Sequence, residues 1–284
     1  MIPTTFDYSR ATSLDDAIAR LAASGGGAKL LAGGHSLIPL MKLRLSEPST
    51  LIDIARIPGL AGITEKDGKI QIGAATTHHA VATSALLADK CPALAETAAT
   101  IGDPQVRNRG TIGGSLAHAD PAADYPAILV ALDAEIHIKG KGGWRAVKAN
   151  DFFQGMFTVD LQPDEIIAGV HVKPAKAAAY AKLHQRASHF AIVGVGAALD
   201  VSGGTIGAAR IGLTGASTHA IRLANVEAAL AGKALSDATI AAAAAVAGQG
   251  LEDLNADIHA SADYRRAQIK VFTKRALDAA RARA

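Results

Sequence analysis

The sequence predicts an α+β fold in two domains of unequal size, and three observations support this. The chain has 284 residues, which is long for one ordinary hydrophobic core. Helix-like and strand-like patterns of apolar residues alternate up to residue 172, whereas beyond it two tightly joined strands precede two Ala-rich helices. A connector of small residues at 174–179 separates the two patterns. We therefore expect domains at 1–175 and 176–284.

The first helix is expected to begin after Ser13, whose hydroxyl can cap free N–H groups while Asp15 and Asp16 favour the positive end of the helix. Apolar residues then recur at helical spacing until a glycine-rich stop at 24–27. A short buried strand is expected at 29–32. It leads into a pair of glycines and then a brief helix.

Later elements follow from the same criteria. Asp67-Gly68 is a type I′ turn signal between alternating apolar residues, and it predicts a hairpin over 62–75. Thr76 or Thr77 is expected to cap the next helix. We expect strands at 51–54, 134–138, 166–172, 193–201 and 205–213, and helices at 92–101, 128–132, 237–249 and 263–281.

Composition excludes several classes of protein. Hydrophobic residues make up 49% of the chain and aromatic residues only 4%, so Ala, Val, Leu and Ile must build the core. The net charge of +3 would suit nucleic acid, but the 29 Lys and Arg residues are spread along the chain and are not interleaved with aromatic residues. We therefore expect no nucleic-acid partner.

Cys91 is the single cysteine, so the chain can form neither an internal disulfide nor a four-thiolate iron–sulfur cluster. It indicates a reducing compartment. Residues 1–8 lack the order of a signal peptide, and no apolar run approaches the roughly 20 residues that span a bilayer. The expected location is the cytoplasm, with no membrane span.

Two glycine-rich segments carry the strongest functional signal, LLAGGHSL at 30–37 and GTIGGS at 110–115. A Gly-Gly step removes two β-carbons and lets main-chain N–H groups point into one small space, which is how a backbone holds a phosphate. Two such loops in one chain could clamp the two phosphates of a dinucleotide from opposite sides.

Two other glycine-rich stretches do not meet the requirements of nucleotide motifs. Residues 194–199 resemble a Rossmann fingerprint, but Leu199 stands where Gly or Ala is needed and no acidic residue follows at the required distance. We expect a strand whose glycines permit close packing. Residues 25–29 resemble a P-loop without the hydroxyl residue that should follow Lys29, which argues against an ATPase.

Polar residues near the loops admit weaker interpretations. His78 and His79 point about 100° apart on a helix and cannot easily share a metal ion, so a solvated or capping role is expected. His118, Asp120 and Asp124 follow the second loop, where contact with a cofactor's hydroxyls and simple loop solvation are equally open. Neither a nucleophile elbow nor a suitably spaced carboxylate pair is present, which favours chemistry borrowed from a cofactor.

Residues 32–37 and 111–115, with Asp120-Pro121 and Asp124 behind them, resemble the two flavin-pyrophosphate loops of the FAD-binding medium subunit of molybdenum hydroxylases. This is the xanthine dehydrogenase and aerobic carbon monoxide dehydrogenase family. The resemblance covers essentially the whole chain. It implies a bipartite FAD-binding domain of the vanillyl-alcohol-oxidase (PCMH) type, split near residue 57, followed by a small C-terminal α+β domain of the CO dehydrogenase flavoprotein type.

The resemblance also implies the cofactor contacts. The matching positions are Leu30, Leu31, Ala32, Gly33, Gly34, His35, Ser36, Leu37, Ile101, Thr111, Ile112, Gly113, Gly114, Ser115, Asp124, Ile167, Lys182 and Phe190. Lys182 matches a basic residue near the flavin ring, where a positive charge favours the reduced anionic flavin. Phe190 stands where some relatives have a Tyr over the isoalloxazine face. A Phe ring could still stack there, but the hydroxyl is lost, and whether Phe190 stacks on the flavin stays open. No catalytic side chain or metal ligand is implied on this chain.

The family implies a heterotrimer, usually doubled. A large subunit carries the molybdenum cofactor and oxidises the substrate, a small subunit carries two [2Fe-2S] clusters, and the FAD of this chain passes electrons to an external acceptor. The lone Cys91 agrees with clusters on another chain. A stand-alone FAD oxidase of the same fold is the alternative. The substrate (carbon monoxide, purine, N-heterocycle or aldehyde) and the acceptor (quinone, NAD or another carrier) stay open.

Overall fold

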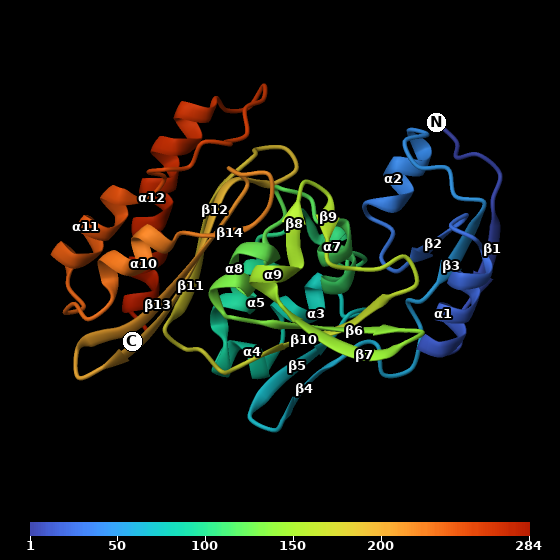
Figure 1. The fold of residues 1–284 in the computed structure, drawn as a ribbon, viewed down its shortest axis with the longest axis horizontal. Helices are drawn as coiled ribbons and strands as arrows, with labels where there is room; N and C mark the ends of the chain where they lie inside the picture. Colours follow the sequence, from blue (N-terminus) through green and yellow to red (C-terminus); the bar gives the residue numbers. More distant parts are fainter.

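The computed structural model describes all 284 residues, in three units arranged along the long axis of the molecule (Figure 1). The N-terminal unit is built from β1 (Asp7–Arg10), α1 (Leu14–Ala23), β2 (Ala28–Leu31), α2 (Leu37–Lys42) and β3 (Thr50–Asp53). Its three strands pair in parallel in the order β1-β3-β2. The predicted cap is confirmed, since the Ser13 hydroxyl accepts a hydrogen bond from the Asp16 N–H at 3.0 Å.

The central unit holds a five-stranded antiparallel sheet of order β4-β5-β10-β6-β7. Its elements are β4 (Ile63–Lys66), β5 (Lys69–Gly73), α3 (His78–Ala82), α4 (Ala85–Lys90), α5 (Pro92–Ala99), α6 (Pro104–Arg107), α7 (Ile112–His118), α8 (Tyr125–Ala131), β6 (Glu135–Gly140), β7 (Gly143–Lys148), α9 (Ala149–Phe152), β8 (Phe153–Gly155), β9 (Thr158–Val159) and β10 (Ile166–Val172). The hairpin is confirmed: Asp67 and Gly68 have φ of 53° and 70°, as a type I′ turn requires.

One face of this sheet is apolar and the other polar. Along β6, Ile136 and Ile138 are fully buried, whereas Glu135 and His137 alternate with them and are partly exposed. The helices between β5 and β6 lie on the buried side, and the opposite side faces outward (Figure 1). The strict alternation is that of a sheet with one solvated face.

The C-terminal unit is a four-stranded antiparallel sheet, order β11-β12-β13-β14, covered by helices. Its elements are β11 (Ala178–His184), β12 (Ala191–Ser202), β13 (Thr205–Thr214), β14 (Ile221–Arg222), α10 (Ala224–Leu230), α11 (Asp237–Val246) and α12 (Ala262–Arg281). The glycines of β12 and β13 pack against α8, since a Cβ on Gly196 would lie 2.8 Å from the Ile128 Cα and one on Gly212 would lie 2.0 Å from the Ala127 carbonyl oxygen. The expectation of close packing is confirmed.

Two hydrophobic cores stabilise the chain. The larger comprises residues between 11 and 178 together with Ala198 and Ala220, and the smaller comprises residues between 179 and 280. The division at 175/176 stays a prediction, because Ala178, Ala198 and Ala220 join the larger core from beyond it. No helix of the structure is both long enough and apolar enough to cross a bilayer.

Candidate cofactor site

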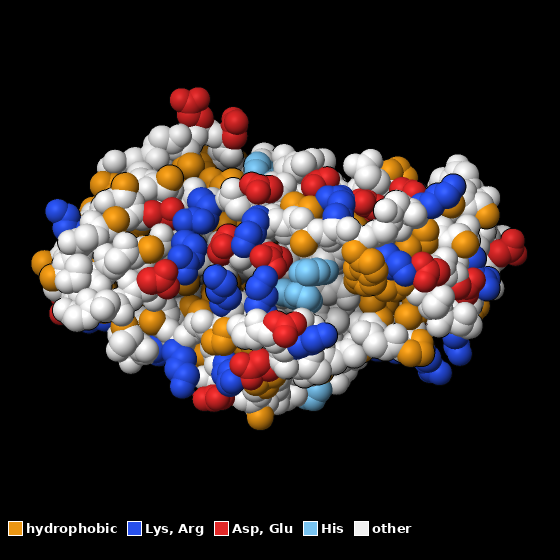
Figure 2. Space-filling view, turned by 60° about the horizontal axis from the view of Figure 1, so that its bottom comes forward, with side chains coloured by type: hydrophobic (Ala, Val, Ile, Leu, Met, Phe, Trp, Pro, Cys, Tyr) orange, Lys and Arg blue, Asp and Glu red, His pale blue; other side chains and the backbone are white.

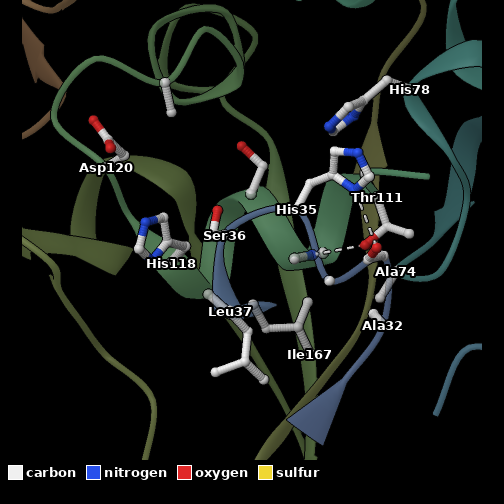
Figure 3. A pocket seen from close by; sticks show the side chains of 18 of the residues that line it. Ala32, His35, Ser36, Leu37, Ala74, His78, Thr111, His118, Asp120 and Ile167 are labelled. Carbon is white, nitrogen blue, oxygen red and sulfur yellow. Dashed lines mark hydrogen bonds between the residues drawn. The ribbon is translucent and has the colours of Figure 1, made fainter. Parts of the chain in front are cut away.

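A cleft of about 540 Å³ lies between the N-terminal and central units, within the usual range of small-molecule sites. Both glycine segments line it, together with parts of α3, α7 and β10. Figure 3 shows His35, Ser36 and Leu37 of the first segment, Thr111 of the second and His118 at the end of α7 around the same space. The structure thus brings the two segments together as predicted, although they are separated by more than seventy residues.

The first glycine loop, residues 32–37, leads from the end of β2 into α2. Its two glycines are required by different constraints. A Cβ on Gly33 would lie 2.1 Å from the Arg109 carbonyl oxygen, so the backbones of the two segments touch at this point. Gly34 has φ of +75°, a conformation that L side chains rarely adopt.

The first loop presents free donors. The N–H groups of residues 33–36 donate to no backbone acceptor, and α2 begins without a hydrogen bond from the Ser36 side chain. Successive N–H groups of this kind form an anion-binding concavity. The only hydrogen bond of the His35 ring within the chain is between Nδ1 and the Gly33 carbonyl oxygen, at 3.2 Å.

The second glycine loop uses its donors internally. The N–H of Ile112 donates to the Thr76 carbonyl at 3.0 Å and that of Gly113 to the Ala74 carbonyl at 2.8 Å. The N–H of Gly114 donates to Thr111 Oγ1 at 3.1 Å. The N–H groups of residues 112–114 are therefore not free to donate to a phosphate, whereas those of residues 33–36 are.

Glycine in the second loop serves packing. A Cβ on Gly113 would lie 2.5 Å from the Ala74 Cβ, so the first turn of α7 sits directly against the end of β5. What this loop contributes to the cleft is a close backbone surface and the hydroxyl-bearing Ser115, which lines the wall.

Most of the predicted contact residues line the cleft. They are Leu30, Ala32, Gly33, Gly34, His35, Ser36, Leu37, Ile101, Thr111, Gly113, Gly114, Ser115, Asp124, Ile167 and Phe190. Leu31, Ile112 and Lys182 do not line it. Leu31 is the last residue of β2 and Ile112 is fully buried in the larger core.

Lys182 lies behind the wall of the cleft. Its ammonium donates to the His189 carbonyl at 2.6 Å and to the Thr100 carbonyl at 2.9 Å, and it lies 2.9 Å from Asp124 Oδ1. Tyr180 donates its hydroxyl to the same carboxylate at 2.6 Å. Burial raises the pKa of Asp124, while Lys182 and Tyr180 oppose that shift. Asp124 thus connects the cleft wall to a buried polar network.

The prediction of a solvated or capping role was wrong for His78. His78 is buried, lines the cleft, and its Nδ1 lies 3.2 Å from the Tyr125 hydroxyl. Burial, with the nearby His35 and Arg107, lowers the pKa of His78 to about 4. His79 is exposed, as expected. Nothing in the local pattern separates the two histidines, because the partner Tyr125 is distant in sequence.

Other lining residues were not predicted from the sequence. These include Lys29, Leu40, Ser46, Ile54, Ala74, Ala75, Gly102, Val106, Leu161, Glu165, Ile166 and Ser188. His118 and Asp120, for which two roles were open, also line the cleft. Most of the additional residues are small or apolar, so only their position in the fold marks them as lining residues.

The fold and the cleft together define an α+β protein with a ligand-sized cleft between two units, lined by a glycine loop whose N–H groups are free to hold an anion. A family model described as "FAD binding domain in molybdopterin dehydrogenase" matches residues 4–175, and one described as "CO dehydrogenase flavoprotein C-terminal domain" matches residues 178–280. The chain belongs to this family: it is an FAD-binding medium subunit of a molybdenum hydroxylase. The resemblance noted in the sequence is confirmed.

Relatives of known function agree over the full length. The chain is 42% identical to the carbon monoxide dehydrogenase medium chain of Hydrogenophaga pseudoflava, covering 100% of this chain and 99% of the relative. It is 41% identical to the 6-hydroxypseudooxynicotine dehydrogenase complex subunit alpha of Paenarthrobacter nicotinovorans, covering 98% and 95%. A solved structure of carbon monoxide dehydrogenase from Hydrogenophaga pseudoflava superposes with a TM-score of 0.95 at 42% identity, covering 100% of both chains.

The residues of the cleft fit FAD. The unpaired N–H groups of the first loop suit a pyrophosphate, and the Gly33 position leaves no room for a side chain between the loops. Apolar residues that line the cleft, among them Ile101, Ile167 and Phe190, suit the ring systems of a dinucleotide.

Proposed function

We propose that this chain holds FAD with its pyrophosphate on the N–H groups of residues 33–36, while the second loop closes the other side with Ser115. The single observation that carries this proposal is the run of unpaired N–H groups in the cleft. Bound FAD supplies the redox chemistry, accepting electrons and passing them on. The side chains of the chain bind and orient it.

Individual residues have distinct positioning roles in this proposal. His78, neutral because burial lowers its pKa, packs against Gly110 of the second loop and contacts Tyr125. Lys182 acts on the site through Asp124 and the His189 carbonyl, and Phe190 directly follows His189 on the wall of the cleft. The buried ion pair thereby fixes the segment that presents Phe190.

The electrons are proposed to come from [2Fe-2S] clusters of a small partner subunit, which takes them from a large molybdenum subunit, in a heterotrimer that is doubled. Exposed apolar side chains near the cleft support a partner surface. Leu43 and Leu45, 52% and 71% exposed, follow α2. Phe157, 53% exposed, packs on His118 with ring centroids 5.2 Å apart, and His118 lines the cleft. Large apolar side chains that stay exposed are typical of surfaces that a partner covers.

The large molybdenum subunit is proposed to determine which substrate the complex oxidises. The two relatives above are named for dehydrogenases of different substrates, yet they resemble this chain to nearly the same degree. The acceptor, whether quinone, NAD or another carrier, is external to the chain. A cytoplasmic location is proposed on the single, unpaired and buried Cys91.

The test is anaerobic mixing of the purified flavoprotein with candidate substrates, with and without the two partner chains, while flavin absorbance is recorded. Bleaching only in the presence of partners is expected. Bleaching of the isolated chain at the rate of the full complex would favour the stand-alone oxidase. Gel-shift assays at two salt concentrations are expected to detect no DNA binding.

A further inference from the structure

The outward face of the five-stranded sheet carries a cluster of metal-ligating side chains that is separate from the cleft. Glu135 and His137 lie two residues apart on β6, so both project from the same face. His171 on β10 pairs directly with Glu135 in the register of the two strands. Figure 2 shows histidine side chains gathered at the middle of this face, among acidic and basic ones.

The three side chains converge. The imidazoles of His137 and His171 stack with centroids 3.6 Å apart and an interplanar angle of 28°. His137 Nε2 lies 3.8 Å from Glu135 Oε2, and one donor atom from each of the three residues lies within 4.8 Å of the others. His137 Nε2 is shielded from solvent and has no hydrogen-bond partner. A buried nitrogen without a partner is unusual in native proteins.

We propose that Glu135, His137 and His171 form a binding site for a divalent transition-metal ion such as Zn²⁺. Two imidazoles and one carboxylate are a donor set that Zn²⁺ takes in proteins, with a further position left for water. Tetrahedral bonds of about 2.1 Å place donor atoms about 3.4 Å apart. The donor atoms, which lie within 4.8 Å of one another, would have to move closer to reach that spacing when an ion binds.

Lys69 is the competitor of the metal. Its ammonium lies 2.5 Å from Glu135 Oε2, and that of Lys148 lies 3.3 Å from Oε1. The Lys69 side chain is 34% exposed, so it can turn toward water when an ion takes its place. The metal ion would thus replace the Lys69 ammonium on the Glu135 carboxylate. Removal of the Lys69 charge should therefore strengthen metal binding.

The experiment is calorimetric titration of the FAD-loaded full chain with Zn²⁺ in a non-chelating buffer. One ion per chain is expected. His171→Ala and Glu135→Gln should each weaken binding by about tenfold or more, and Lys69→Met should tighten it several-fold. His79→Ala, which removes an exposed imidazole elsewhere, is the matched control and should leave the affinity unchanged.

Unchanged FAD content and thermal midpoint in each variant will show that the fold is intact. As a second measurement, Co²⁺ should give visible absorption of a low-symmetry site, absent from the His137→Ala/His171→Ala double variant. Equal Zn²⁺ affinity of that double variant and the parent, or the lack of saturable binding in the parent, would overturn the proposal.

Discussion

The two glycine loops share the sequence pattern Gly-Gly followed by Ser, directly or after one residue, yet the structure uses their glycines differently. In the first, the backbone turns through Gly34 at φ of +75° and leaves the N–H groups of residues 33–36 without acceptors. In the second, residues 112–114 donate to Ala74, Thr76 and Thr111, and Gly113 lets a helix sit against a strand end. The first loop has donors free to bind a ligand, whereas most donors of the second loop hold it against the central sheet.

The difference teaches that a glycine pair is ambiguous by itself. The absence of a Cβ lets a ligand approach the backbone closely, and it equally lets a neighbouring segment of the chain do so. What separates the two cases is whether the N–H groups already have acceptors, and that depends on segments far away in the sequence.

The largest expected effect is that of Gly33→Val. A side chain there would meet the Arg109 carbonyl oxygen, push the loops apart and displace the donors of residues 33–36. We expect near-complete loss of bound FAD, measured by flavin absorbance per chain, with far-UV circular dichroism unchanged. Gly142→Val, at a glycine with open space around it, is the control. Full flavin content in Gly33→Val would break the assignment of the first loop.

The next effect is a loss of stability in acid that arises from His78, which packs beside the second loop. Its pKa falls from 6.5 to about 4 in the folded chain, so the unfolded chain takes up the proton first as the pH decreases. Stability should fall between about pH 6.5 and about pH 4 and by up to about 3 kcal/mol. Urea unfolding at about pH 7 and about pH 4.5 should show a smaller difference for His78→Gln, and an equal difference would contradict this role.

Gly113→Ala tests the supporting role of the second loop. The added methyl group would lie 2.5 Å from the Ala74 Cβ and 2.8 Å from the Ala74 carbonyl oxygen, so α7 or the end of β5 must shift. We expect unfolding free energy to fall by about 1–3 kcal/mol, measured by urea denaturation of the FAD-free chain. Gly142→Ala should change little. Loss of FAD without loss of stability would instead make this loop a binding loop like the first.

The smallest expected effect compares the two hydroxyl residues. Ser36→Ala and Ser115→Ala each remove a hydroxyl from the cleft wall without altering the backbone. Each should weaken FAD binding by about tenfold, the value of a hydrogen bond to a charged group. Fluorescence titration of the FAD-free chain measures this. A loss of FAD affinity in Ser36→Ala but not in Ser115→Ala would place the whole pyrophosphate on the first loop.

Local signals in the sequence predicted much of the framework. The Ser13 cap, the Asp67-Gly68 turn and the strand over 166–172 were correct, because each depends on neighbouring residues alone. Short elements such as α4, α9 and β1 were not predicted, since four to six residues give too little periodicity. The helix α7 was hidden because its first turn holds a glycine pair, which usually interrupts a helix.

The sequence by itself determined the class of protein, the two segments that form the cleft and fifteen of the 34 residues that line it, because motifs and their spacing can be read from one chain. Only the tertiary structure decided which N–H groups stay free, that His78 is buried against Tyr125, and that Lys182 lies behind Asp124. It also placed His171 of β10 against His137 of β6. The physical reason is that hydrogen-bond partners and burial are set by segments that meet only after the chain has folded.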